Sequence, residues 1–100
     1  MLVLKTLALE PMHGYGIGAR IEQISQGVFQ VNGGSLFPAI YRLERNGLIK
    51  GDWRTTENNR RAKYYGLTPR GRAALERETR EWEEQTTAIA RILRTSTGDL

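Results

Sequence analysis

The middle of the chain carries the side chains best suited to hold an anion. Residues 51–70 contain five basic and two acidic side chains, so this short segment holds +3 of the net charge of +4. Guanidinium and ammonium groups donate hydrogen bonds to phosphate, and a local basic patch on a small domain favours a polyanionic partner. The tightest basic group, Arg60-Arg61-x-Lys63, could also be a solvated hairpin tip, as charged turns usually are.

No residues are spaced for catalysis or metal binding. His13 is the only histidine and cysteine is absent, so a ligand cluster cannot be assembled around either residue type. We expect His13 to cap the helix that follows it rather than to bind a metal. Glu83 and Glu84 are adjacent on an expected helix and point in different directions, so they form no acid–base pair. The sequence therefore predicts no enzyme activity, no metal and no cofactor.

Two helices are expected in the first third of the chain. Residues 2–9 form a short apolar segment that ends before Pro11, because proline cannot continue the hydrogen-bond ladder of a helix. A second helix is expected from Tyr15 to about Gln26, with Gly27 as its C-terminal stop. Its apolar residues follow the helical spacing and comprise Ile17, Ile21, Ile24 and Val28.

A third helix follows the turn-forming residues 31–35. Its N-cap is expected near Gly34 or Ser35, and its end near Asn46, where Gly47 follows. Leu36, Ile40 and Leu43 share one face, which should pack inward. The opposite face is polar, basic and partly aromatic, and consists of Ser35, Pro38, Tyr41, Arg42 and Arg45.

A two-stranded hairpin is expected next. Alternating residues from Leu48 to Arg54 predict a strand, residues 55–61 a polar loop, and residues 62–67 the returning strand. Strand alternation turns one of Tyr64 and Tyr65 towards the core, and the other could stack on a nucleobase. Trp53 is expected in the core or as an anchor of the hairpin.

The last helix is expected to support self-association. Thr68 and Pro69 are a hydroxyl cap and a proline suited to the first helical position, and the helix should continue to about Arg94. Residues 95–100 are expected to form a flexible tail. Six residues repeat with spacings of 4, 3, 4, 3 and 4, which is typical of a coiled-coil seam: Leu75, Thr79, Trp82, Thr86, Ile89 and Leu93.

This order of elements predicts a mainly α fold with a small β-hairpin, namely a winged helix-turn-helix over residues 1–67 and a dimerisation helix over 68–94. In helix-turn-helix proteins the second helix of the motif enters the major groove of double-stranded DNA. We therefore expect the exposed face of the third helix to contact DNA, with Arg42 at base edges. Arg60, Arg61 and Lys63 are expected to hold phosphates.

Three segments together resemble the PadR family of bacterial transcriptional regulators. They are PMHGYGIGARIEQIS, GGSLFPAIYRLERNGLI and WRTTENNRRAKYYGLTPRGRAAL, and the likeness extends over roughly residues 2–94. The sequence is most similar to the short members, which have one winged domain and a single C-terminal helix. The resemblance implies a homodimeric repressor that binds an inverted-repeat operator and is released by a small-molecule or stress signal.

The sequence departs from the family pattern in two places. The family's usual Asn-Pro-Gly-Ser before the third helix is Asn32-Gly33-Gly34-Ser35 here, which loosens the turn. Family members usually begin about ten residues earlier, so the chain is expected to start inside the first helix. The resemblance also gives Trp82 two alternative roles, one as a packing residue of the dimer and one as the wall of an effector pocket.

Two other functions remain as alternatives. A winged helix can act as a protein-interaction module, in which case the basic patch would be incidental and binding would depend little on salt. RNA binding would require exposed aromatic platforms on a sheet, of which a two-stranded wing offers little. We predict no signal peptide and no membrane-spanning segment, and a cytoplasmic location fits the lack of cysteine.

Overall fold

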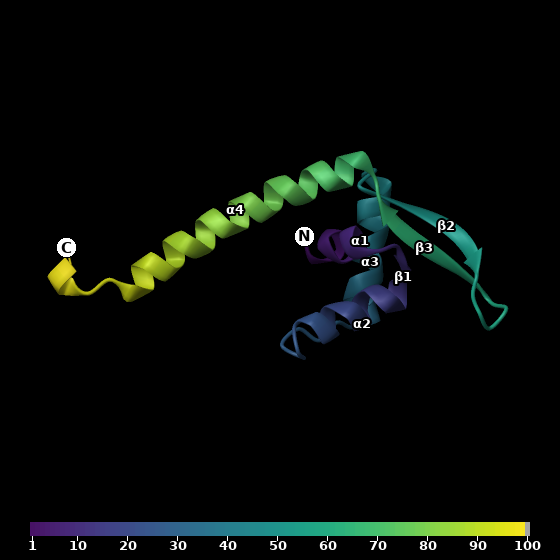
Figure 1. Cartoon of the computed structure of the whole chain (residues 1–100), viewed down its shortest axis with the longest axis horizontal. Helices are drawn as coiled ribbons and strands as arrows, with labels where there is room; N and C mark the ends of the chain where they lie inside the picture. Colours follow the sequence, from purple (N-terminus) through teal and green to yellow (C-terminus); the bar gives the residue numbers. More distant parts are fainter. Residues whose placement is uncertain (100) are drawn as a thin grey trace.

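The computed structural model describes residues 1–99 and combines a helical body with a projecting hairpin and a long final helix (Figure 1). The helices are α1 (Leu2–Leu9), α2 (Gly14–Ile24), α3 (Gly33–Arg45) and α4 (Pro69–Arg94). The strands are β1 (Met12–His13), β2 (Ile49–Thr55) and β3 (Arg61–Leu67), and a 3₁₀ turn, η1, spans Thr97–Asp99. The expected winged helix-turn-helix with a long C-terminal helix is confirmed.

The sheet has three strands rather than the expected two. Its order is β1-β3-β2, and all pairs are antiparallel. Strand β1 adds only two residues to the edge of β3, where Met12 pairs with Tyr65 and His13 with Tyr64. Two residues are too few to show an alternating pattern, so no sequence pattern indicated this strand.

Side-chain caps begin three of the helices. The Nδ1 atom of His13 accepts a hydrogen bond from the Gly16 N–H at 3.1 Å, so the expected capping role of His13 is confirmed. Asn32 caps α3 through its Oδ1, which accepts from the Ser35 N–H at 2.9 Å. The cap therefore lies before the predicted Gly34 or Ser35, because the Asn32 side chain can satisfy a free amide of the first turn.

Helix α2 is shorter than its apolar pattern indicated. It ends at Ile24, and Gln26 and Gly27 then adopt left-handed backbone conformations with φ of 53° and 80°. The predicted inward stripe therefore stops at Ile21. Ile24 and Val28 are exposed, because the chain has already turned away from the body.

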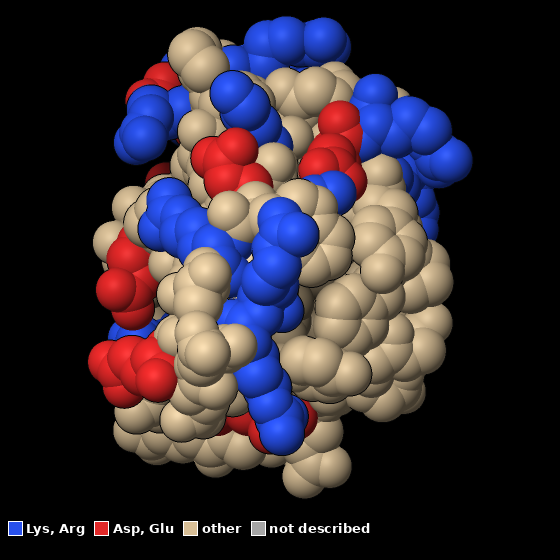
Figure 2. Space-filling view, turned by 90° about the vertical axis from the view of Figure 1, so that its right-hand side faces the viewer, with Lys and Arg blue, Asp and Glu red and all other residues tan. Residues whose placement is uncertain are grey.

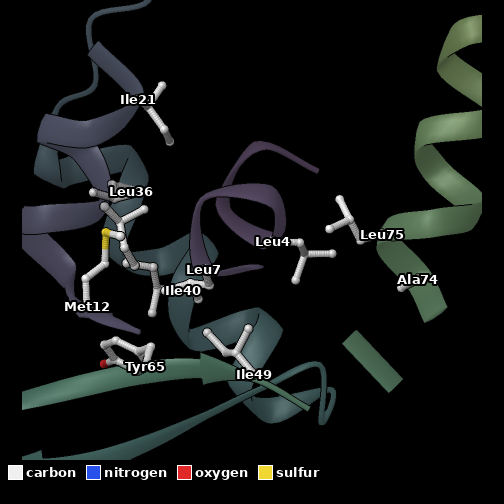
Figure 3. Close-up of a cluster of buried hydrophobic side chains, with 11 residues drawn as sticks. Leu4, Leu7, Met12, Ile21, Leu36, Ile40, Ile49, Tyr65, Ala74 and Leu75 are labelled. Atoms are coloured by element: carbon white, nitrogen blue, oxygen red, sulfur yellow. The ribbon is translucent and has the colours of Figure 1, made fainter. Parts of the chain in front are cut away.

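The hydrophobic core surrounds α1. Leu4 and Leu7 lie between the buried residues of α2 and α3 on one side and those of α4 on the other (Figure 3). Leu36 and Ile40 are buried as predicted, while Leu43 is half-buried at the margin of the core. The buried member of the tyrosine pair is Tyr65. The expectation of Trp53 in the core is wrong: its side chain is 60% exposed, since β2 has left the body at that point.

Helix α4 is fixed to the body at the turn between α3 and β2. The Thr68 hydroxyl accepts from the Gly71 N–H at 3.1 Å and donates to the Gly47 carbonyl at 2.6 Å. Gly71 lies so close to this turn that a Cβ atom there would overlap the carbonyl oxygen of Leu48. Gly47 itself has φ of +76°, which favours glycine. The start of α4 thus has a set position against the body.

Most of α4 projects away from the rest of the chain (Figure 1). We call residues 1–77 the winged body and residues 78–94 the outer α4 segment; the buried residues of α4 all lie before residue 78. The molecule extends 65 Å along its longest axis but 28 and 22 Å along the others. Its radius of gyration, 17.1 Å, exceeds the ~13 Å of a compact chain of this length.

The C-terminal tail is partly structured. Thr95 donates from its hydroxyl to the Arg91 carbonyl at 2.7 Å, and residues 97–99 form η1. The last residue of the predicted flexible tail, Leu100, lies outside the described residues. Across residues 1–99, no helix combines the length and the hydropathy needed to cross a membrane.

Candidate nucleic-acid interface

The outward face of α3 carries the five residues singled out in the sequence. They lie opposite the buried Leu36 and Ile40, and all five are exposed: Ser35, Pro38, Tyr41, Arg42 and Arg45. Arg42 and Arg45 occupy the last turn, where their charge also complements the helix dipole. No salt bridge is recorded for either guanidinium within the described chain, so both have hydrogen-bond donors to offer a ligand.

The wing presents two exposed arginines next to its turn. Arg60 is the last loop residue and Arg61 the first of β3. The guanidinium of Arg61 lies 5.6 Å from the centre of the Trp53 ring, which holds it on the face of the wing that looks towards α3. Seen from the wing end, Lys and Arg side chains run down the middle of the molecule beside a broad uncharged area (Figure 2).

Lys63, the third basic residue predicted for phosphate contact, has a partner inside the protein. Its Nζ lies 2.9 Å from a carboxylate oxygen of Glu44 on α3, and both side chains are 29% exposed. The hydrogen bond to Glu44 raises the pKa of Lys63 above its ordinary value. The structure therefore joins the wing to α3 through Lys63, and leaves less of this charge available to DNA than at Arg60 or Arg61.

Gly51 makes room for this ion pair. A Cβ atom at Gly51 would collide with the stem of Lys63 and would come within 2.9 Å of the Glu44 carboxylate. A glycine inside a strand marks the close approach of another group, which is the signal in the sequence that could have revealed the contact. Sequence spacing did not pair Lys63 with Glu44, because the two residues meet only when β3 folds back over α3.

The outer face of the wing holds an arginine that the sequence analysis did not assign. Arg54 is exposed, and its guanidinium lies 5.2 Å from the centre of the Tyr64 ring. Tyr64 in turn meets His13 edge to face at 5.6 Å. Its neighbour Tyr65 points the other way, and burial raises the pKa of the Tyr65 hydroxyl. The wing therefore carries an arginine on an aromatic ring on each of its faces.

The predicted seam of α4 divides into a buried and an exposed part. Leu75 was expected at a dimer interface, but it packs in the core of its own chain at 9% exposure, because α4 is still seated on α1 there. Thr79 and Thr86 are half-buried, and the Thr86 hydroxyl donates to the Trp82 carbonyl at 2.8 Å. The remaining seam residues are more than half exposed: Trp82, Ile89 and Leu93.

A groove of about 660 Å³ separates α1 from the middle of α4. Its apolar lining includes Leu2, Leu75 and Trp82, and Lys5 and Glu83 stand among the charged residues around it. Within residues 1–99, no three His, Cys, Asp or Glu side chains gather in a way that could hold a metal ion. Apolar contact and hydrogen bonding by basic groups are therefore the chemistry that these surfaces offer.

Comparison with known proteins identifies a family and several relatives. The model of the transcriptional regulator PadR-like family matches residues 3–77. A transcriptional regulator from Mycobacterium tuberculosis is 36% identical over 63 residues, which are 63% of this chain and 58% of that protein. An uncharacterised 37.1 kDa protein of a Streptomyces fradiae transposon is 46% identical over 78 residues, or 78% of this chain. The chain matches about a fifth of the length of the transposon protein and somewhat over half of the mycobacterial one.

Solved structures share nearly the whole fold. A transcriptional regulator from Clostridium thermocellum has a TM-score of 0.83 at 28% identity, covering 93% of this chain and 90% of its own. A PadR family regulator from Clostridium difficile has a TM-score of 0.78 at 26% identity, covering 92% and 94%. The family is one of transcriptional regulators and not of enzymes, which agrees with the expectation from the sequence. The chain belongs to the PadR-like family of transcriptional regulators.

Proposed function

We propose that the protein is a transcriptional regulator that binds double-stranded DNA through α3 and the wing. The observation that carries the proposal is the exposure of Arg42 and Arg45 on the outward face of α3, beside the wing arginines Arg60 and Arg61. Helix α3 is the second helix of the helix-turn-helix, which in this class of protein lies in the major groove. Arg42 contacts base edges, and the wing arginines hold phosphates.

The proposed regulator acts as a homodimer. Trp82, Ile89, Ile92 and Leu93 are between 52% and 79% exposed on the outer α4 segment. A two-fold dimer through these residues would present two α3 helices about 34 Å apart, one turn of B-DNA. The operator is then an inverted repeat. Repression, rather than activation, is proposed from the resemblance to PadR regulators.

The groove between α1 and α4 is the proposed site of regulation by a small molecule. Its wall contains the Trp82 indole, and a flat apolar compound suits its lining. The alternative occupant is the partner's α1, in which case Trp82 only packs. Indole fluorescence of a Trp53→Phe variant separates these roles, because Trp82 is then the only tryptophan. Quenching by planar aromatic compounds supports the effector site, and no quenching with dimerisation intact supports packing alone.

Substitution of Arg42 tests the proposed DNA contact. Arg42→Ala should cost about 1–3 kcal/mol of binding free energy and relax the base preference at one pair per half-site. Arg91→Ala is the matched control, since Arg91 is also exposed but lies on the outer α4 segment. Arg60→Ala should weaken all sequences alike and lower the salt slope by about one for each contact. An Arg42→Ala protein with unchanged affinity and preference would contradict the assignment of α3.

Salt dependence separates the proposal from the protein-interaction alternative. Binding to DNA releases counterions and should weaken steeply as salt rises, whereas an apolar protein interface should not. Fluorescence anisotropy of a labelled duplex at several salt concentrations measures this slope. A flat slope with tight binding to another protein would favour the interaction module.

A further inference from the structure

A second groove of about 660 Å³ lies between the wing and the helix-turn-helix. Its aromatic lining includes Tyr15 of α2, Phe37 and Tyr41 of α3, Trp53 of β2 and the buried Tyr65 of β3. Arg60 and Arg61 belong to its wing side. Tyr41 also lies on the outward face of α3, so the groove is continuous with the surface proposed to enter the major groove.

Three aromatic side chains of this groove are more than half exposed. Tyr15 is 77% exposed, Trp53 60% and Tyr41 53%. Tyr15 and Phe37 meet edge to face with their ring centres 5.2 Å apart, and Tyr41 follows at 6.2 Å from Phe37. Tyr15, Phe37 and Tyr41 form a connected aromatic floor, in which Phe37 packs against the hydrophobic core and the two tyrosines stay exposed. Exposed apolar floors of this kind, bordered by polar groups, mark binding surfaces.

The charges around the floor favour an anion. Lys63, which also lines the groove, is paired with Glu44 at 2.9 Å. Arg61 lies 5.6 Å from the centre of the Trp53 ring, and Arg60 precedes it at the end of the loop. Both guanidinium groups are exposed. The groove thus combines apolar rings with two arginines, Arg60 and Arg61, that form no salt bridge within the described residues 1–99.

We propose that this groove holds the sugar–phosphate strand that runs between α3 and the wing when the regulator binds duplex DNA. Deoxyribose offers an apolar face to Tyr15 and Trp53, while Arg60 and Arg61 hold the flanking phosphates. The inference rests on the proposed function and adds Tyr15 and Trp53 as contacts. Because every nucleotide carries the same sugar and phosphate, these residues position the protein without reading sequence.

Trp53 gives a direct test, because the chain has only one other tryptophan. In a Trp82→Phe variant, acrylamide should quench the exposed Trp53 strongly in the free protein. Addition of a fluorescein-labelled duplex should reduce this quenching with the same midpoint as the rise in duplex anisotropy. In the matched Trp53→Phe variant, quenching of Trp82 should not change. A rise in anisotropy with unaltered quenching of Trp53 would overturn the groove assignment and leave DNA binding intact. No rise in anisotropy would overturn both proposals.

Substitution of Tyr15 tests the aromatic floor without the use of tryptophan fluorescence. Tyr15→Ala should weaken binding by about three- to tenfold on every duplex, a loss typical of one good contact. Phe29→Ala is the control, since Phe29 is 53% exposed but is not part of the groove. Equal affinities of Tyr15→Ala and Phe29→Ala would contradict the proposal. A loss confined to one sequence would contradict its assignment to the backbone.

Discussion

The winged body and the outer α4 segment differ in how far their apolar side chains are buried. In the winged body, Leu4, Ile17, Ile40 and Ile49 are at most 2% exposed. In the outer α4 segment, Trp82, Ile89, Ile92 and Leu93 are between 52% and 79% exposed. The body therefore has its own core, whereas the outer segment has an apolar surface that a single chain leaves uncovered.

Their charges differ as well. The winged body contains twelve basic and six acidic side chains, and the outer α4 segment three basic and four acidic. A polyanion is therefore attracted to the body and not to the helix. These differences suit the two partners proposed for the molecule: DNA for the body, and a second copy of the chain for the helix.

The largest effect should come from truncating a core leucine, compared with an exposed one. Leu4→Ala should lower the free energy of unfolding by about 2–5 kcal/mol at any protein concentration, because it leaves a cavity beneath α1. Leu93→Ala should lower stability only at concentrations where the dimer forms. Urea unfolding at a low and a high protein concentration measures both. If both variants lost the same free energy of unfolding at the low protein concentration, the distinction between the two regions would be contradicted.

The contact that seats the start of α4 within the winged body can be broken at Gly71. Gly71→Ala should cost about 1–3 kcal/mol, because the added methyl group meets the Leu48 carbonyl and α4 must shift. Gly66→Ala is the control, since the nearest atoms there, in Pro11, are 4.0 Å from the new methyl group. Thermal unfolding compares them. Similar melting temperatures for the two variants would show that α4 is not held at this point.

Trp82→Ala addresses the outer segment alone. The dimer should dissociate at least tenfold more readily, about 1.4 kcal/mol, because a large aromatic side chain near the middle of an interface contributes much of its energy. Analytical ultracentrifugation measures this constant. Unfolding of the diluted chain should stay as in the wild type. An unchanged dimer would overturn the assignment of the seam.

The elements were predictable where one local signal decided them. Residues 2–9 became α1 as expected, and Thr68 and Pro69 began α4. The sequence left Tyr64 and Tyr65 as two candidates for the buried side of β3, and the structure shows that Tyr65 is the buried one. Strand β1 could not be found, since its two residues are strand only because β3 lies beside them.

The candidate site was predictable in part. Helical periodicity identified the exposed face of α3, because its opposite face carries Leu36 and Ile40. Helical periodicity placed Leu75 wrongly at a dimer interface, because a regular seam does not show which of its turns are already covered by the same chain. The sequence also did not reveal the ion pair of Lys63 or the exposure of Trp53, because both depend on how far β2 and β3 extend beyond the core.

The smallest effect is a gain of stability within the winged body. Gly33 is the first residue of α3, and Asn32 before it has φ of −96° and ψ of 150°, which a following proline accepts. Gly33→Pro should therefore stabilise the chain by about 0.4–1 kcal/mol, chiefly by restricting the unfolded state. Comparison with Gly33→Ala isolates the contribution of the proline ring to the free energy of unfolding. If urea unfolding showed no higher stability for the proline variant than for the alanine variant, the capping geometry would be contradicted. The affinity of the proposed dimer should be unaffected by either substitution.

The most direct test of the whole account is a selection of bound sequences from a randomised duplex library. A dimer that reads DNA through two α3 helices should enrich an inverted repeat whose half-sites are centred about one helical turn, roughly 10 base pairs, apart. Arg42→Ala should lose the preference at one base pair in each half-site, and Arg91→Ala should recover the wild-type repeat. Enrichment of no sequence, or of a single site without symmetry, would contradict the account.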